Sequence, residues 1–199
     1  MDSDKLFDFL SDEGFQEPKT GKLFFPAYIY TYDQTEEYEV RAGIETLNKK
    51  LQRPTRNLDS LILNIYDELI SFLKDKSFVG ESIYDQIIEK EKENPIEASK
   101  WIIEEIGAGE FYEYIENKVK SHFYNDTSGK RVYLLIYGFG TAYPYLRASD
   151  FLKNTEALIK DFKIIVFYPG IYQDGHYSLF SELHDDNIYR ANHLNNYIG

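Results

Sequence analysis

Four short apolar runs divide the chain, and longer amphipathic stretches separate them. The runs are rich in aromatic and β-branched residues, a composition typical of β-strands. Uninterrupted apolar runs that alternate with helices indicate parallel strands covered on both faces. The four predicted strands cover residues 22–33, 60–65, 131–138 and 163–170. We therefore predict a three-layer α/β domain with a mostly parallel central sheet of four to five strands.

Apolar residues between the strands recur at the spacing of an α-helix. Val40, Ile44 and Leu47, for example, would lie on one face of a helix. The same periodicity continues after the second strand and reappears after the third. The helices predicted in this way cover residues 36–52, 66–74 and about 149–161.

The interval between the second and third strands is long, charged and helical in pattern. Near its centre, Asn94 can cap a helix, Pro95 fits the first turn and Glu97 completes a capping box. We predict that this interval, about 76–124, is a helical insertion in the domain.

The first twenty residues differ from the rest of the chain. They are mostly polar and predict a partly disordered N-terminal arm, 1–20, with one apolar patch. The patch consists of Leu6, Phe7, Phe9 and Leu10. A length of 199 residues favours one domain, so we predict that residues 21–199 form a single α/β domain.

Cysteine is absent from the sequence. This excludes a disulfide framework, a thiolate metal site and a cysteine nucleophile. The chain starts with acidic residues and lacks the basic-then-apolar order of a secretory signal. No apolar run approaches the ~20 residues that a membrane helix needs. We therefore expect a cytoplasmic protein that does not contact a membrane.

The charge balance is strongly acidic, with 34 acids against 22 bases and a net charge of −12. Phosphate backbones attract Lys and Arg through counterion release, so this balance argues against direct nucleic-acid binding.

The third strand ends in a glycine-containing turn. Gly138 and Gly140 form a G-x-G pair, but Tyr143 stands where a dinucleotide fingerprint requires a third glycine. No GxxxxGK[ST] motif occurs either. These glycines therefore predict a sharp turn away from the sheet. Arg147, a few residues later, could bind a phosphate or carboxylate, or could form an internal salt bridge.

The densest polar cluster lies at residues 183–194. His184, Asp185 and Asp186, with His176 or His193, could assemble a hard metal site. Asp186, Asn187 and Arg190 could instead form a hydrogen-bond knot that ties the C-terminal segment to the sheet. We favour the knot, because adjacent acids rarely point at one ion. The sequence contains no Ser-His-Asp order and no G-x-S-x-G elbow. We therefore predict no catalytic residue, no metal and no cofactor.

Two segments resemble a known family. They are "YGFGTAYPYLRASDFLKNTEAL" and "IIVFYPGIYQDGHYSLFSELHDDNIYRANHL". Their G-x-G-x-x-Y-P-Y-L-R, F-Y-P-G-x-Y and D-D-N-x-Y-R-A patterns are similar to those of BrxB, a small component of BREX bacteriophage-exclusion systems. Ile188 departs from the family pattern, which usually has tyrosine there, and Asn192 replaces an aromatic residue.

The resemblance implies a role in phage defence, in company with a methyltransferase, a large ATPase and a PglZ-type phosphatase-like protein. It implies a non-catalytic assembly component that acts through protein–protein contacts, with the PglZ-type protein as the first candidate partner and a homodimer as another. The alternative is a degenerate nucleotide-binding or metal-dependent enzyme that uses the same strand ends.

The positions that match the family motifs form our candidate functional surface. We expect them to gather where strands three and four end, with the C-terminal segment folded back over the sheet. They are Gly138, Gly140, Tyr143, Pro144, Arg147, Phe167, Pro169, Gly170, Tyr172, Asp185, Asp186, Asn187, Tyr189 and Arg190.

Overall fold

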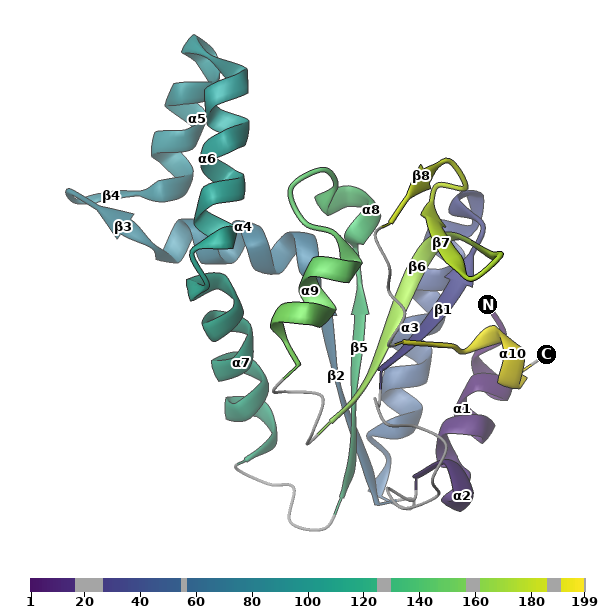
Figure 1. Ribbon diagram of the computed structural model, residues 1–199. Coiled ribbons are helices and arrows are strands. Elements are labelled where there is room, and N and C mark those ends of the chain that lie inside the picture. The colour runs from purple at the N-terminus through teal and green to yellow at the C-terminus, as the bar shows by residue number, and fades with distance from the viewer. Residues whose placement is uncertain (17–26, 55–56, 125–129, 157–161, 186–190, 199) are drawn as a thin grey trace.

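A parallel sheet forms the centre of the molecule, and helices cover both of its faces (Figure 1). The computed structural model describes residues 1–16, 27–54, 57–124, 130–156, 162–185 and 191–198. The strand order is β2-β5-β6-β1-β9, and each neighbouring pair is parallel. The bounds are β1 Ala27–Tyr32, β2 Leu58–Asn64, β5 Arg131–Tyr137, β6 Lys163–Gln173 and β9 Asn192–His193. The predicted three-layer α/β architecture is confirmed.

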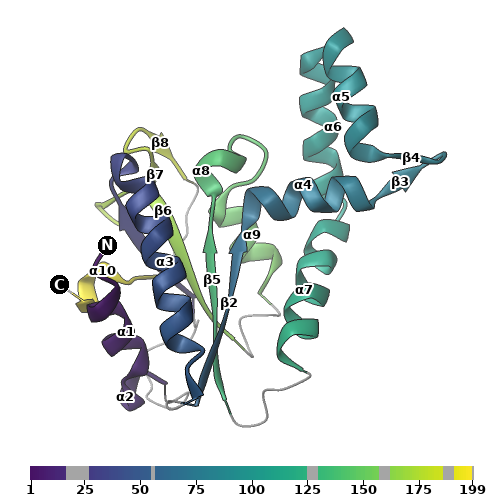
Figure 2. The same cartoon turned by 180° about the vertical axis from the view of Figure 1, so that it is seen from behind.

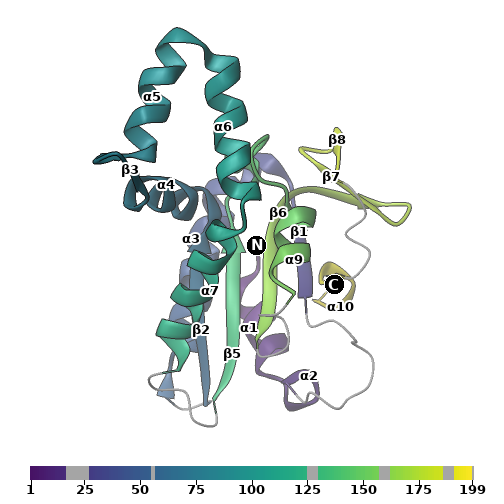
Figure 3. The same ribbon diagram turned by 60° about the vertical axis from the view of Figure 1, so that its left-hand side comes forward.

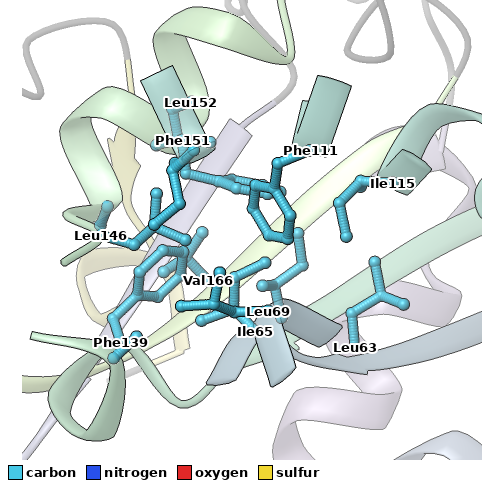
Figure 4. Packing of buried hydrophobic residues seen from close by; sticks show 14 of the residues in the cluster. Leu63, Ile65, Leu69, Phe111, Ile115, Phe139, Leu146, Phe151, Leu152 and Val166 are labelled. Carbon is cyan, nitrogen blue, oxygen red and sulfur yellow. The ribbon is translucent and has the colours of Figure 1, made fainter. Parts of the chain in front are cut away.

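Two hydrophobic cores lie on opposite faces of the sheet, and β6 contributes to both. Ile165 and Phe167 point into the core under helices α1 and α3, whereas Val166 and Tyr168 point into the other. Burial on both faces explains why β6 reads as a continuous apolar run. Figure 4 shows the second core, where Val166 meets residues of α4, α7 and α9. The helices of the two outer layers are α1 Ser3–Ser11, α3 Glu37–Leu51, α4 Ile65–Asp75, α7 Glu110–Phe123, α8 Phe139–Ala142 and α9 Ala148–Asn154.

The interval predicted as a helical insertion contains more than helices. It begins with a two-stranded hairpin, β3 Ser77–Phe78 and β4 Glu81–Ser82. Helices α5 (Ile83–Glu93) and α6 (Pro95–Gly107) then form a helical hairpin that projects beyond the body (Figure 1). Asn94 caps α6 as expected, since its Oδ1 accepts from the Glu97 amide at 3.3 Å. The Glu97 carboxylate, however, pairs with Lys90 at 2.8 Å.

In the sequence, Pro169-Gly170 is a turn signal at the end of the fourth predicted strand. Strand β6 nevertheless continues past these residues to Gln173. Its end pairs with the antiparallel strand β7 (His176–Leu179), and β7 in turn pairs with β8 (Leu183–His184). The apolar pattern predicted neither β7 nor β8. A Cβ at Gly170 would lie 2.1 Å from the Ser178 carbonyl oxygen. Gly170 therefore permits the close approach of β7. Close approach of another backbone is a common reason for a glycine inside a strand.

Helix α9 ends at Asn154, earlier than predicted. Residues 157–161, the remainder of the predicted helix, lie outside the described part of the chain. No helix in the described ranges is long and apolar enough to cross a membrane.

The described part of the predicted N-terminal arm, residues 1–16, is helical and packed. Leu6 and Leu10, one turn apart on α1, are fully buried against α3 and the sheet. The Tyr133 hydroxyl donates to the Leu10 carbonyl at 2.6 Å. Two leucines one turn apart form an apolar stripe on the helix. When α1 packs on the sheet, this stripe buries apolar surface of both the helix and the sheet.

Lys163, the first residue of β6, anchors the end of this N-terminal segment. Its ammonium group lies 3.8 Å from the centre of the Phe15 ring and donates to the Phe15 carbonyl. Phe15 belongs to α2 (Glu13–Gln16) and stacks on Tyr133. Burial, assisted by the nearby Arg131, lowers the pKa of Lys163 to about 8, although the ring and the carbonyl favour the charged form.

We predict that Lys163 makes stability rise with pH above 8. Its pKa is lowered from 10.5 to about 8 on folding, so the unfolded state holds more protons between these values. From pH 7 to 9.5 the unfolding free energy of the wild type should increase relative to Lys163→Met. After allowance for partial solvent screening, we expect a gain of about 1 kcal/mol.

Urea unfolding of both proteins at several pH values measures this difference. Lys153→Met, a lysine on the exposed side of α9, is the control and should leave the pH slope unchanged. Parallel pH curves for wild type and Lys163→Met would contradict the prediction.

Candidate functional site

A shallow pocket lies at the carboxyl ends of β5 and β6, between the α8–α9 loop and the β7–β8 turn. This is the edge of a parallel sheet at which α/β proteins bind their ligands. The volume that a water centre can reach is about 10 Å³, room for about one water. The pocket is lined by Phe139, Tyr143, Leu146, Arg147, Ala148, Tyr168, Leu179, Leu183, His184 and Asp185.

Gly138 links β5 to α8 as the N-cap residue of this helix, and Gly140 lies within α8. Gly138 has a φ of 92°, and a Cβ there would lie 2.2 Å from Oδ1 of Asn64. A Cβ at Gly140 would lie 2.9 Å from the ring of Phe180. The space left by these two glycines is therefore occupied by other side chains of the protein. This supports the prediction of a sharp turn.

The loop from α8 to α9 forms one side of the pocket. Tyr143 and Pro144 are joined by a cis peptide bond. The guanidinium carbon of Arg147 lies 5.8 Å from the centre of the Tyr143 ring, within range of a cation–π contact. Arg147 also acts electrostatically on Asp185, whose carboxylate it favours. Both of these contacts of Arg147 are with residues of the protein itself.

Asp185 is the principal buried acid of the pocket, with 8% of its surface exposed. The Ser149 hydroxyl donates to its Oδ1 at 2.6 Å and the Tyr168 hydroxyl to its Oδ2 at 3.2 Å. Its amide donates to the Tyr177 carbonyl at 3.0 Å. Burial raises the pKa of Asp185, while Ser149, Tyr168 and Arg147 oppose this increase.

Ser149 and Tyr168 were not among the predicted site residues. Tyr168 could have been found from strand alternation, because it lies one residue from Phe167 and hence on the opposite face. Burial raises the pKa of Tyr168, which keeps it a hydroxyl donor to Asp185. Ser149 lies in the first turn of α9, and the sequence alone gives no signal for its contact with a residue 36 positions away.

Phe167 and Tyr172 do not line the pocket. Phe167 is fully buried on the other face, where its ring lies 5.8 Å from that of Tyr30. Tyr172 lies beyond the pocket, with its ring 4.6 Å from those of Tyr177 and His193. Pro169 and Gly170 are buried where β6 meets β7.

The C-terminal segment lies on the sheet at both of its described ends. His184 in β8 pairs with Ser178 of β7, and β9 extends the sheet beside β1. Asn195 continues this edge with its side chain, because its amide group exchanges two 2.9 Å hydrogen bonds with the backbone of Thr31. Of the predicted surface, Asp186, Asn187, Tyr189 and Arg190 lie outside the described residues.

The described part of the chain contains no group of three or more His, Asp or Glu residues that could hold a metal ion. His184 is already engaged, with Nδ1 3.1 Å from the Ser178 hydroxyl. The pocket therefore offers a small, mostly apolar depression with one buried carboxyl at its base.

We predict that Asp185 makes stability fall with rising pH. Its pKa in the folded protein is raised above the ordinary 3.8, so the folded state holds more protons just above pH 3.8. The unfolding free energy of the wild type, relative to Asp185→Asn, should therefore decrease as pH rises from 4 and level off above the folded pKa. Asp174→Asn, in an exposed turn, is the control. A difference that rises or stays constant over this interval would contradict the prediction.

Comparison with known proteins identifies the family of this chain. The sequence model of that family, "BREX protein BrxB", matches residues 61–194, from β2 through β9. A "BREX protein BrxB" of Bacillus cereus (strain H3081.97) is 24% identical over 189 residues, covering 94% of this chain and 93% of the relative. Among solved structures, none matches significantly. The chain belongs to the BrxB family of BREX proteins.

Proposed function

We propose that this protein is a non-catalytic assembly component of a BREX anti-phage complex in the cytoplasm. Membership of the BrxB family supports an accessory role in phage defence. The observation that carries the assembly role is the packing of the G-x-G turn. Asn64 and Phe180 occupy the space beside Gly138 and Gly140, where a nucleotide-binding loop would leave room for phosphate.

The rim of the pocket has the chemistry of a contact surface. Leu183 lies at the pocket mouth with 38% of its surface exposed, and Ile171 and Tyr172 are also exposed on the β6–β8 ribbon. Tyr143 and Arg147 complete the rim on the side of the α8–α9 loop. Aromatic residues and arginine near exposed aliphatic side chains are typical of protein interfaces.

The acidic character of the chain bears on the kind of partner. A net charge of −12 favours association with a basic surface and speeds the encounter with it. We propose another BREX protein as that partner, with the PglZ-type protein as the first to test.

The second candidate is a degenerate nucleotide-binding or metal-dependent enzyme. It is favoured by the position of the pocket at the carboxyl ends of β5 and β6, together with the buried carboxyl of Asp185. This candidate requires the loops around the pocket to open, because the present space holds about one water.

We predict that Leu183→Ser reduces association with the BREX partner roughly tenfold, a typical loss for an interface anchor. The measurement is co-purification of tagged protein from cells that express the complete BREX cluster. Tyr38→Ser is the matched control, because Tyr38 is 85% exposed on α3 in the opposite helical layer. If the wild type recovers no BREX protein, the assembly role is wrong.

A thermal-shift experiment separates the two candidates. We expect no stabilisation by ATP, GTP, Mg²⁺ or Mn²⁺, whereas a ligand at a hundred times its dissociation constant would stabilise the protein by about 2.7 kcal/mol. A shift that Asp185→Asn abolishes would favour the enzyme. The unfolding temperature of each variant without ligand provides the baseline.

A further inference from the structure

The β3–β4 hairpin ends in two exposed apolar residues. Phe78 is 64% exposed and Val79 is 88% exposed. The hairpin follows α4 and extends away from the helices beside it (Figures 1 and 2). Single exposed apolar residues are common on protein surfaces, so exposure alone assigns no role to the hairpin tip, Phe78–Val79.

The backbone of the hairpin tip is the informative observation. Val79 and Gly80 form a two-residue loop with φ values of 54° and 89°, both in the left-handed region. Loops of this kind favour Asn or Asp followed by Gly. A β-branched residue is strongly disfavoured at positive φ, so local stability alone would not select valine here.

A second two-residue loop in the same chain carries the residue types that this backbone conformation favours. Asp174 and Gly175 connect β6 to β7 with φ values of 52° and 84°. The two loops therefore have nearly the same backbone conformation. One carries the residue that the turn favours, and the other carries valine.

Packing does not explain the valine. Phe180 also has a positive φ, 54°, but its ring fills the space above Gly140, and this contact offsets the unfavourable backbone. Val79 is almost fully exposed and gains no comparable burial. A contact outside the described chain would supply the missing compensation.

The hairpin holds its tip in a fixed position. Nε2 of Gln86 donates to the carbonyl oxygens of Phe78 and Glu81, at 2.9 and 3.2 Å. The amide of Ile83 donates to the Lys76 carbonyl at 2.8 Å. An apolar tip that is already ordered loses little conformational entropy on binding.

The charge beside the tip is acidic. Glu81 is exposed and forms no ion pair with any described residue. The two lysines that precede the hairpin in the chain are engaged elsewhere: Lys76 pairs with Glu105 at 2.7 Å, and the Lys74 ammonium lies 4.8 Å from the centre of the Tyr84 ring. The tip therefore presents apolar side chains next to an uncompensated carboxylate.

We propose that Phe78 and Val79 insert into an apolar pocket, edged by Lys or Arg, on another protein of the BREX assembly. This inference rests on the proposed assembly function and adds a second contact surface to it. An anionic membrane surface would repel Glu81 and the chain as a whole, and a second copy would carry the same charge of −12.

The test uses a substitution that improves the turn. Val79→Asn places a favoured residue in the left-handed loop, so the variant should unfold at the same temperature as the wild type or higher. Combined with Phe78→Ser, it removes both apolar side chains. We expect the double variant to lose at least tenfold in co-purification of its BREX partner from cells expressing the complete cluster.

Tyr38→Ser is the control for loss of an exposed aromatic residue and should retain the partner. Undiminished recovery by the double variant overturns the inference. If Leu183→Ser loses the partner and the double variant does not, the assembly function stands and the hairpin inference alone fails. If the wild type recovers no BREX protein, both fail.

A crosslinking experiment identifies the occupant directly. With p-benzoylphenylalanine in place of Phe78, we expect a crosslink to a basic-edged apolar pocket of a BREX protein. Crosslinking only to a second copy of this chain would overturn the proposal. So would flotation with phosphatidylcholine–phosphatidylserine vesicles that depends on Phe78 and Val79.

Discussion

Strand β6 is the element on which the fold and the pocket both depend, because it is buried on both faces and paired along both edges. Its parallel neighbours are β5 and β1, and its end also pairs with β7. Phe167 and Tyr168 show the consequence at one point: the first packs under α3, and the second reaches Asp185. The same strand therefore joins the two cores and fixes the base of the pocket. A change in its register by one residue would exchange these two side chains.

The sequence predicted the structure well wherever burial determines the spacing of apolar residues along the chain. The runs around β2, β5 and β6 predicted the parallel sheet, because two-sided burial demands continuous apolar residues. The sequence predicted less where the same residue type occurs in two kinds of structure, as glycine does in turns and inside strands. Gly170 followed a proline and indicated a turn, but its missing side chain instead admits the Ser178 carbonyl. The leucine pair on α1 was visible in the N-terminal arm, yet spacing alone did not show that a sheet face was available to cover.

Sequence motifs predicted only part of the pocket. The G-x-G turn and Asp185 were identified from motifs, and the structure brings both to one end of the sheet. Ser149 and Tyr168, which hydrogen-bond to Asp185, come from separate elements, and only the packing of α9 on β6 brings them together. Contacts of this kind depend on tertiary geometry that a single sequence does not encode in any local period.

Helix α4 connects the G-x-G turn beside the pocket with the β3–β4 hairpin. Asn64 caps the start of α4 and lies against Gly138, while the hairpin follows the last turn of α4 (Figure 3). At 1.5 Å per residue, the 11 residues of this helix separate its two ends by about 16 Å. A hydrogen bond between the hydroxyl groups of Ser99 on α6 and Tyr145, with 3.4 Å between the oxygens, also ties the projecting helices to the α8–α9 loop.

A packed helix of fixed length keeps two surfaces at a constant separation. A partner that reaches both would make the second contact at high effective concentration, so each contact could be weak while the pair is stable. The strained valine at the hairpin tip is compatible with folding for a separate reason. The unfavourable backbone conformation of Val79 is confined to a two-residue loop outside both cores. The packing of the buried strands and helices is therefore unaffected.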